Sequence, residues 1–128
     1  GDQVVRDEEG YLYFVARKDD MIKTSGYRVS PSEVEEIAYE SGLVAGAAAL
    51  GLPHAMLGQG ILLVVTAAPG APEELAEELG TRYRQALPGF MQPLAIVVRD
   101  ALPHNQNGKI DRRALAEAYR DRFLEENP

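Results

Sequence analysis

The sequence predicts an α+β domain in which helices flank a central three-stranded sheet and a β-hairpin precedes that sheet. Three apolar segments of strand length, at residues 44–50, 61–67 and 94–98, form the expected sheet. Helical patterns separate them, and short strands interspersed with helices are typical of helices packed on one sheet. Residues 4–6 and 11–15 flank an acidic turn that ends in glycine, which predicts the hairpin. The 128 residues, 45% of them hydrophobic, suffice for one packed core.

The first helix has both a start signal and a stop signal. Ser30 is the expected N-cap, Pro31 the first helical residue, and Glu33 the partner of Ser30 in a capping box. We expect Gly42 to end the helix. One face of the predicted helix is apolar and carries Val34, Ile37 and Ala38.

Two more helices are predicted in the second half of the chain. The segment at residues 51–60 is rich in turn formers. A helix is expected to begin at Pro72, with apolar side chains at fourfold spacing: Leu75, Leu79, Tyr83 and Leu87. Asp111 is the expected N-cap of a final helix, whose apolar face carries Leu115, Ala118, Tyr119 and Phe123. Paired acids such as Glu35 and Glu36 are expected on solvated helix faces.

The composition argues against several classes of function. The net charge of −7 disfavours generic nucleic-acid binding, which usually needs a basic surface. There is no cysteine and there are only two histidines, so we expect no metal site. The longest apolar run, residues 61–68, is too short to span a membrane. The first residues lack the basic start and apolar core of a signal peptide, and we expect a cytoplasmic protein.

A lysine in a polar loop is the first candidate functional feature. Gly108 and Lys109 form a Gly-Lys pair, and the chain has only three lysines against ten arginines. Glycine permits close approach of a ligand, and lysine is a flexible point charge suited to phosphate or carboxylate oxygens. A surface lysine in a solvated loop is the alternative. Residues 17–20 and 24–28, taken alone, are typical of a charged linker and an ordinary turn.

Two long segments together resemble one enzyme superfamily. RKDDMIKTSGYRVSPSEVEE, at residues 17–36, and LPHNQNGKIDRRAL, at residues 102–115, resemble the C-terminal domain of the AMP-forming adenylating enzymes. This superfamily comprises acyl- and aryl-CoA synthetases, the adenylation domains of nonribosomal peptide synthetases, and luciferases. The segments between the two motifs are similar as well, so the resemblance covers nearly the whole chain.

The resemblance implies a two-step reaction in a two-domain enzyme. A carboxylate attacks the α-phosphorus of ATP to give an acyl-adenylate and pyrophosphate, and the acyl group then passes to a thiol of coenzyme A or of a carrier-protein phosphopantetheine. Residues 1–18 would end a large N-terminal domain, and residues 19–128 would form the small mobile C-terminal domain. The large domain would bind most of the ATP, with Mg, so the isolated chain is expected to be inactive.

Four residues match positions that the family uses for the nucleotide and for domain rotation. Lys109 matches the lysine that bridges carboxylate and phosphate oxygens in adenylation, where a cation stabilises charge developing at phosphorus. Asp19 matches the hinge at which the small domain turns. Asp2 and Arg17 match nucleotide-binding positions near the ribose.

Two further residues match the loop that swings in for thioester formation. Gly26 matches its glycine, where the absence of a side chain leaves room for the pantetheine arm, and Arg28 matches its basic position. One departure lies in the lysine loop, which often carries Thr or Ser near its glycine in the family. Here residues 105–107 read Asn-Gln-Asn.

Three functions stay open after this comparison. The pattern GYRVSPSEVE favours an acyl-CoA ligase, with a carboxylic acid, ATP and coenzyme A as substrates. An enzyme that loads an acyl or amino acid onto a carrier protein is the alternative within the superfamily. A non-catalytic interaction module that keeps only the fold is the alternative outside it, and the presence of Lys109, Asp19 and Gly26 argues against it.

Overall fold

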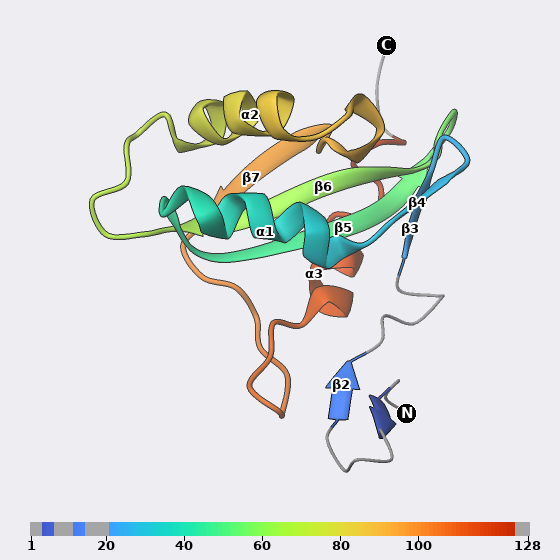
Figure 1. Cartoon of the computed structure of the whole chain (residues 1–128), viewed down its shortest axis with the longest axis horizontal. Helices are drawn as coiled ribbons and strands as arrows, with labels where there is room; N and C mark the ends of the chain where they lie inside the picture. Colours follow the sequence, from blue (N-terminus) through green and yellow to red (C-terminus); the bar gives the residue numbers. More distant parts are fainter. Residues whose placement is uncertain (1–3, 7–11, 15–20, 125–128) are drawn as a thin grey trace.

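The structure is a computed structural model that describes residues 4–6, 12–14 and 21–124 (Figure 1). Strands β1 (Val4–Arg6) and β2 (Leu12–Phe14) pair antiparallel, with Val5 opposite Tyr13. The hairpin that the sequence predicts is therefore confirmed over these residues. All other elements lie within residues 21–124.

A five-stranded sheet forms the centre of the described residues. Its strands are β3 (Ile22–Thr24), β4 (Tyr27–Val29), β5 (Val44–His54), β6 (Gly58–Ala67) and β7 (Ala95–Arg99). β6 pairs antiparallel with β5 along one edge. Its other edge pairs with β3 at the start of β6 and with β7, in parallel, farther along. β4 is added at the outer edge of β3.

The α+β class is confirmed, and the sheet is larger than the three strands that the sequence predicts. β3 and β4 flank the turn expected at residues 24–28, and the sequence does not predict them as strands, because strands of three residues are too short to show a period-2 pattern. β5 also continues to His54, through part of the segment expected to be a turn. Pro53 is tolerated there because β5 is an edge strand.

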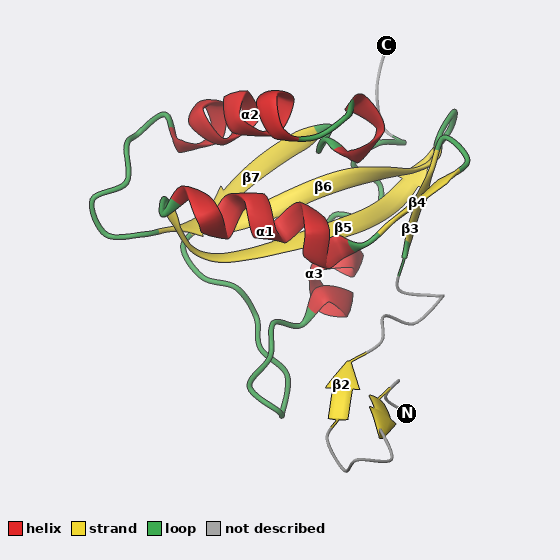
Figure 2. Ribbon diagram, in the orientation of Figure 1, coloured by secondary structure: helices red, strands yellow, loops and turns green. Residues whose placement is uncertain are grey.

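Three helices cover the two faces of this sheet, with α1 (Pro31–Ser41) and α2 (Leu75–Ala86) on one face and α3 (Arg112–Ala118) on the other (Figure 2). Successive strand residues point to opposite faces. One set from β5 and β6 packs toward α1 and α2: Ala47, Ala49, Ile61, Leu63 and Val65. The other set packs toward α3: Ala48, Leu50, Leu52, Leu62 and Val64. Burial on both faces explains why these strands read as continuous apolar runs.

The ends of the helices agree with the sequence in part. Pro31 is at the start of α1, and Gly42 ends it with φ 74° in the left-handed region. The predicted capping box does not form, because the Ser30 side chain makes no cap hydrogen bond; its carbonyl accepts from the backbone N of Glu33 instead. α2 begins at Leu75, three residues later than predicted. No helix in the described part of the chain is long and apolar enough to cross a bilayer.

Tyr83 connects the two helices of one face. Its side chain is 1% exposed, and its hydroxyl donates a hydrogen bond to the carbonyl of Val34 in α1. Burial raises the pKa of Tyr83 above its ordinary value. The folded state therefore keeps this phenol protonated at a pH where an unfolded tyrosine ionises.

Replacing Tyr83 with phenylalanine should lower the free energy of unfolding by about 1 kcal/mol at pH 7, because the hydrogen bond from the Tyr83 hydroxyl to the Val34 carbonyl is lost. Above about pH 10 the unfolded chain loses the Tyr83 proton and the folded chain keeps it, so the stability of the unsubstituted chain falls as pH rises. Tyr83→Phe should make this fall less steep. Urea unfolding at pH 7 and between pH 9.5 and 11 measures both effects; equal pH slopes would contradict the assignment.

Candidate functional site

The lysine loop connects β7 to α3 and is built as a small hairpin. Its base is an antiparallel bridge between His104 and Ile110, below which the backbone N of Asp111 donates to the carbonyl of Pro103. Gly108 has φ 81°, a left-handed conformation that favours glycine. Lys109 is exposed and makes no salt bridge with any residue that the structure describes. The loop therefore presents an ammonium group to solvent from an ordered backbone.

The segment that follows this loop is joined to helix α1 by an ion pair between Arg112 and Glu35. The Asp111 side chain caps α3 by accepting from the backbone N of Ala114 at 3.0 Å, as the sequence predicts. Arg112 Nη2 donates to both carboxylate oxygens of Glu35, at 2.6 and 2.7 Å, and its Nε donates to Oε2 at 2.9 Å. The same Oε2 accepts from the backbone N of Ala49 at 2.8 Å. Glu35 thus joins α1, β5 and the start of α3.

The prediction for Glu35 was wrong, because this residue is 6% exposed rather than part of a solvated helix face. A buried carboxylate needs hydrogen-bonding partners, and Arg112 and Ala49 supply them. The Arg112 side chain remains 47% exposed. Residues 77 positions apart form this pair, so spacing along the sequence gave no signal for it.

The candidate thioester loop is the turn between β3 and β4. Ser25 has φ 55° and Gly26 has φ 85°, the two positive φ angles that a two-residue type I′ hairpin turn requires. A Cβ added at Gly26 would meet no atom of the described structure within 4 Å, apart from its two chain neighbours. Arg28 is exposed on β4, directly opposite Lys23 on β3. The turn therefore presents an open backbone beside two cations.

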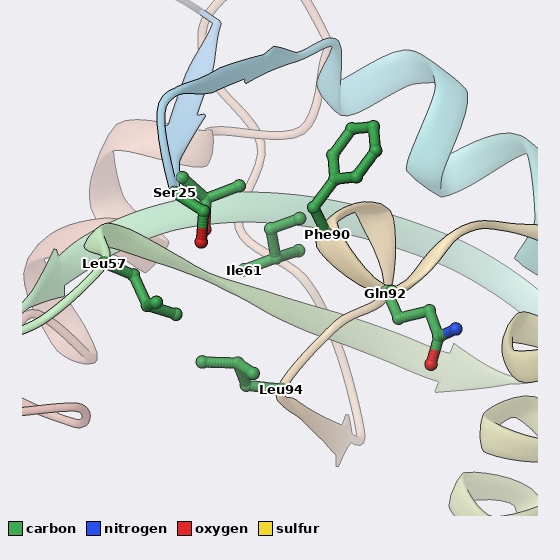
Figure 3. A pocket seen from close by; sticks show the side chains of 8 residues that line it. Ser25, Leu57, Ile61, Phe90, Gln92 and Leu94 are labelled. Atoms are coloured by element: carbon green, nitrogen blue, oxygen red, sulfur yellow. The ribbon is translucent and has the colours of Figure 1, made fainter.

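A pocket of about 250 Å³ lies beside this turn. Figure 3 shows Ser25, Leu57, Ile61, Phe90, Gln92 and Leu94 around it, and Thr24 and Gly89 complete its lining. Phe90 comes from a 3₁₀ turn at Gly89–Met91, and its ring stacks on Tyr27 with centroids 3.9 Å apart. The sequence does not predict this pocket, because its walls come from three segments distant in sequence.

The two candidate loops lie apart from each other: the β3–β4 turn is at one end of the sheet, and the lysine loop extends away from the sheet on the side of α3 (Figure 1). The Ser25–Gly26 turn is beside the β5–β6 turn, where the backbone N of Ser25 donates to the carbonyl of Leu57. The lysine loop instead follows the end of β7, where Arg99 pairs with Thr66 near the end of β6. One small domain therefore presents two distinct polar loops in different directions.

Asp2, Arg17 and Asp19 lie outside the described residues. His54 is structural, because its Nδ1 accepts from the backbone N of Met56 and of Leu57 in the β5–β6 turn. Among the described residues there is no group of three or more His, Cys, Asp or Glu side chains that could hold a metal ion.

Comparison with known proteins identifies relatives over almost the whole chain. Acetyl-coenzyme A synthetase of Parvibaculum lavamentivorans is 40% identical over 96% of this chain, which spans 19% of that relative. Acetyl-coenzyme A synthetase of Shewanella amazonensis is 42% identical over 90% of the chain and 18% of the relative. The chain thus spans about a fifth of the length of these curated relatives.

Solved structures give the same picture. ATP-bound MatB from Rhodopseudomonas palustris superposes with a TM-score of 0.83 and 31% identity, over 96% of this chain and 24% of that one. A Mycobacterium tuberculosis fatty acyl CoA synthetase superposes with a TM-score of 0.77 and 30% identity, over 95% and 24% of the two chains.

The family model described as the AMP-binding enzyme C-terminal domain matches residues 33–109, more than half of the chain. The chain therefore belongs to the AMP-binding enzyme C-terminal domain family.

Proposed function

We propose that this chain is the C-terminal portion of an AMP-forming acyl-CoA ligase. In this proposal residues 1–18 end a large N-terminal domain, residues 19–128 form the small domain that rotates against it, and Asp19 is the hinge. The observation that carries the proposal is the presence of two polar loops that project from different parts of one small domain. A domain that serves two half-reactions by turning needs this arrangement, because each pose brings a different loop to the active site.

Lys109 serves the first half-reaction in this proposal. A carboxylate oxygen of the acid attacks the α-phosphorus of ATP, the bond to the bridging oxygen breaks, and pyrophosphate leaves. Negative charge on the oxygens around phosphorus is stabilised by a cation placed there as the site closes. Lys109 is exposed at the end of an ordered loop, so it can enter a site on another domain without leaving a buried partner. Asp2 and Arg17 would bind the ribose.

The Ser25–Gly26 turn serves the second half-reaction. The thiol of coenzyme A attacks the acyl carbonyl of the adenylate, and AMP leaves. The pantetheine arm has to pass close to protein backbone, and the open side of Gly26 provides that space. The exposed cations Arg28 and Lys23 lie on the same hairpin and suit the phosphates of coenzyme A.

Coenzyme A is the favoured acceptor because the relatives named above are coenzyme A synthetases. A carrier-protein phosphopantetheine is the second candidate, since it presents the same arm and thiol. Supplying the full-length enzyme with coenzyme A, and separately with a holo-carrier protein, distinguishes the two acceptors. Faster thioester formation on the carrier protein would reject the acyl-CoA ligase in favour of the second candidate.

Replacing Gly26 with asparagine in the full-length enzyme should slow thioester formation about tenfold and leave adenylate formation unchanged. Asparagine tolerates positive φ better than other side chains, so the turn is kept while a side chain fills its open side. Gly70→Asn is the matched control, because Gly70 also has positive φ (84°) and an open side but belongs to neither loop. Half-reaction assays on both variants measure the effect. Equal behaviour of the two variants would refute the role of Gly26.

A further inference from the structure

We propose that Asn105 is a positioning residue that holds Lys109 in the conformation needed for adenylate formation. This inference rests on the proposed function, because it assigns Asn105 a task only if Lys109 acts in that step. It concerns the lysine loop alone and assigns no contact between Asn105 and a substrate.

Asn105 binds both backbone groups of Lys109. Its side-chain Oδ1 accepts from the backbone N of Lys109 at 3.1 Å and from the backbone N of Asn107 at 2.9 Å. Its own backbone N donates to the carbonyl of Lys109 at 2.8 Å, and its carbonyl accepts from the backbone N of Gly108 at 3.0 Å. The peptide groups on both sides of the Lys109 Cα are thus fixed by one residue.

The loop has little else to hold its shape. Residues 104–109 are all exposed, so packing does not select their conformation. Leu102 is buried and Ile110 partly buried, and they anchor only the two ends of the loop. An asparagine side chain that accepts from nearby backbone N–H groups replaces the missing packing. Removing its amide leaves the backbone hydrogen bonds of residue 105 in place and takes away two of the four restraints.

The direction of the Lys109 side chain depends on this restraint. Lysine has a long flexible side chain, and the Cα–Cβ bond is the only part of it whose direction is set by the backbone of the loop. Electrostatic stabilisation needs the cation to be near its working position before the reaction begins, since a misplacement of 1 Å can reduce a rate about 100-fold. A loop that samples other conformations spends less time with Lys109 aimed at the phosphate.

The test uses the full-length enzyme with four variants of the loop asparagines, and with Lys109→Ala as the reference for loss of the lysine. Asn105→Ala removes the acceptor, whereas Asn105→Asp and Asn105→Ser each keep one. Asn107→Ala is the matched control, because Asn107 lies in the same loop but its side chain makes no hydrogen bond with the described residues. Each variant is assayed for ATP–pyrophosphate exchange, for thioester formation from a supplied acyl-adenylate, and for its melting temperature.

Asn105→Ala should lower kcat of exchange about tenfold, because two hydrogen bonds no longer select the productive loop. The KM for ATP, thioester formation and melting temperature should stay near their original values. Asn107→Ala should behave like the unsubstituted enzyme, and at least one of Asn105→Asp and Asn105→Ser should recover exchange. This pattern is one that a merely structural role would not produce.

Three outcomes would overturn the inference. Asn105→Ala could leave exchange unchanged while Lys109→Ala abolishes it, which would remove the role of Asn105 and keep the proposed function. Asn105→Ala could slow both half-reactions equally, which would show a general effect on the enzyme. Neither Asn105→Asp nor Asn105→Ser could recover exchange, which would show that the side-chain acceptor is not what matters. If Lys109→Ala leaves ATP–pyrophosphate exchange intact, the adenylation role proposed for Lys109 is itself refuted.

Discussion

Replacing Lys109 with alanine in the full-length enzyme should reduce ATP–pyrophosphate exchange at least about 100-fold, the effect typical of removing one preorganised stabiliser of developing charge. Thioester formation from a supplied acyl-adenylate should remain near the original rate, because the lysine loop follows the end of β7, whereas the Ser25–Gly26 turn lies beside the β5–β6 turn. Lys109 is exposed, so its removal should not alter folding. The two half-reaction rates, measured separately, give the result.

Two further substitutions separate position from charge. Lys23→Ala removes an exposed lysine from β3 and should leave exchange unchanged. Lys109→Arg keeps the charge but replaces a compact ammonium group with a planar guanidinium group. This variant should retain only part of the ATP–pyrophosphate exchange activity. Full activity of Lys109→Arg would show that a positive charge suffices, and unchanged exchange in Lys109→Ala would refute the catalytic role.

Arg112→Ala should lower the free energy of unfolding of the 128-residue chain by about 2 kcal/mol. Its removal leaves the buried carboxylate of Glu35 with one donor, the backbone N of Ala49. Loss of one partner from a fully buried ion pair is worth about 3–5 kcal/mol, and we expect less because half of the Arg112 side chain is exposed. Urea unfolding monitored by circular dichroism provides the measurement.

The neighbouring Arg113 is the matched control for this change. It is exposed and makes no salt bridge within the described ranges, so Arg113→Ala should alter stability by less than about 0.5 kcal/mol. The double variant Glu35→Ala with Arg112→Ala should lose less than the sum of the two single losses, because the pair is coupled. Equal losses for Arg112→Ala and Arg113→Ala would show that the ion pair contributes nothing.

The parts of the fold that the sequence predicts are those set by local chemistry. Gly42 ends α1, Asp111 caps α3, and Leu75, Leu79 and Tyr83 are buried along α2, as their spacing indicates. These features depend on neighbours within about one helical turn. The same reasoning failed for the Ser30 capping box, because a local motif can be replaced by backbone hydrogen bonds without changing the start of the helix.

The parts that the sequence did not predict depend on contacts between distant residues. Nothing within residues 22–29 shows that β3 will join β6, since that pairing is made by Gly58. Glu35 was assigned to a solvated face because its partner, Arg112, lies in another element. The stacking of Phe90 on Tyr27 likewise joins two separate segments. The pairing of β3 with β6, the burial of Glu35 and the stacking of Phe90 on Tyr27 are all decided by contacts between residues distant in sequence.

The candidate site shows the same division. Lys109 and Gly26 were located by motif, and the structure describes both loops. In the sequence, Asn105 is visible only as a departure from the usual Thr or Ser. Asparagine side chains often accept a hydrogen bond from the backbone N two residues later, as Asn105 does from Asn107, and this turn signal could have identified Asn105 as a residue that shapes the loop. Asp2, Arg17 and Asp19 remain predictions, since they lie outside the described residues.

The central claim is that the two loops of one small domain serve two different half-reactions. Measuring both half-reactions for Lys109→Ala and Gly26→Asn, in parallel on the full-length enzyme, tests it most directly. The account predicts a crossed result: Lys109→Ala loses adenylate formation and keeps thioester formation, and Gly26→Asn does the reverse. Loss of the same half-reaction in both variants would contradict the division of labour between the two loops.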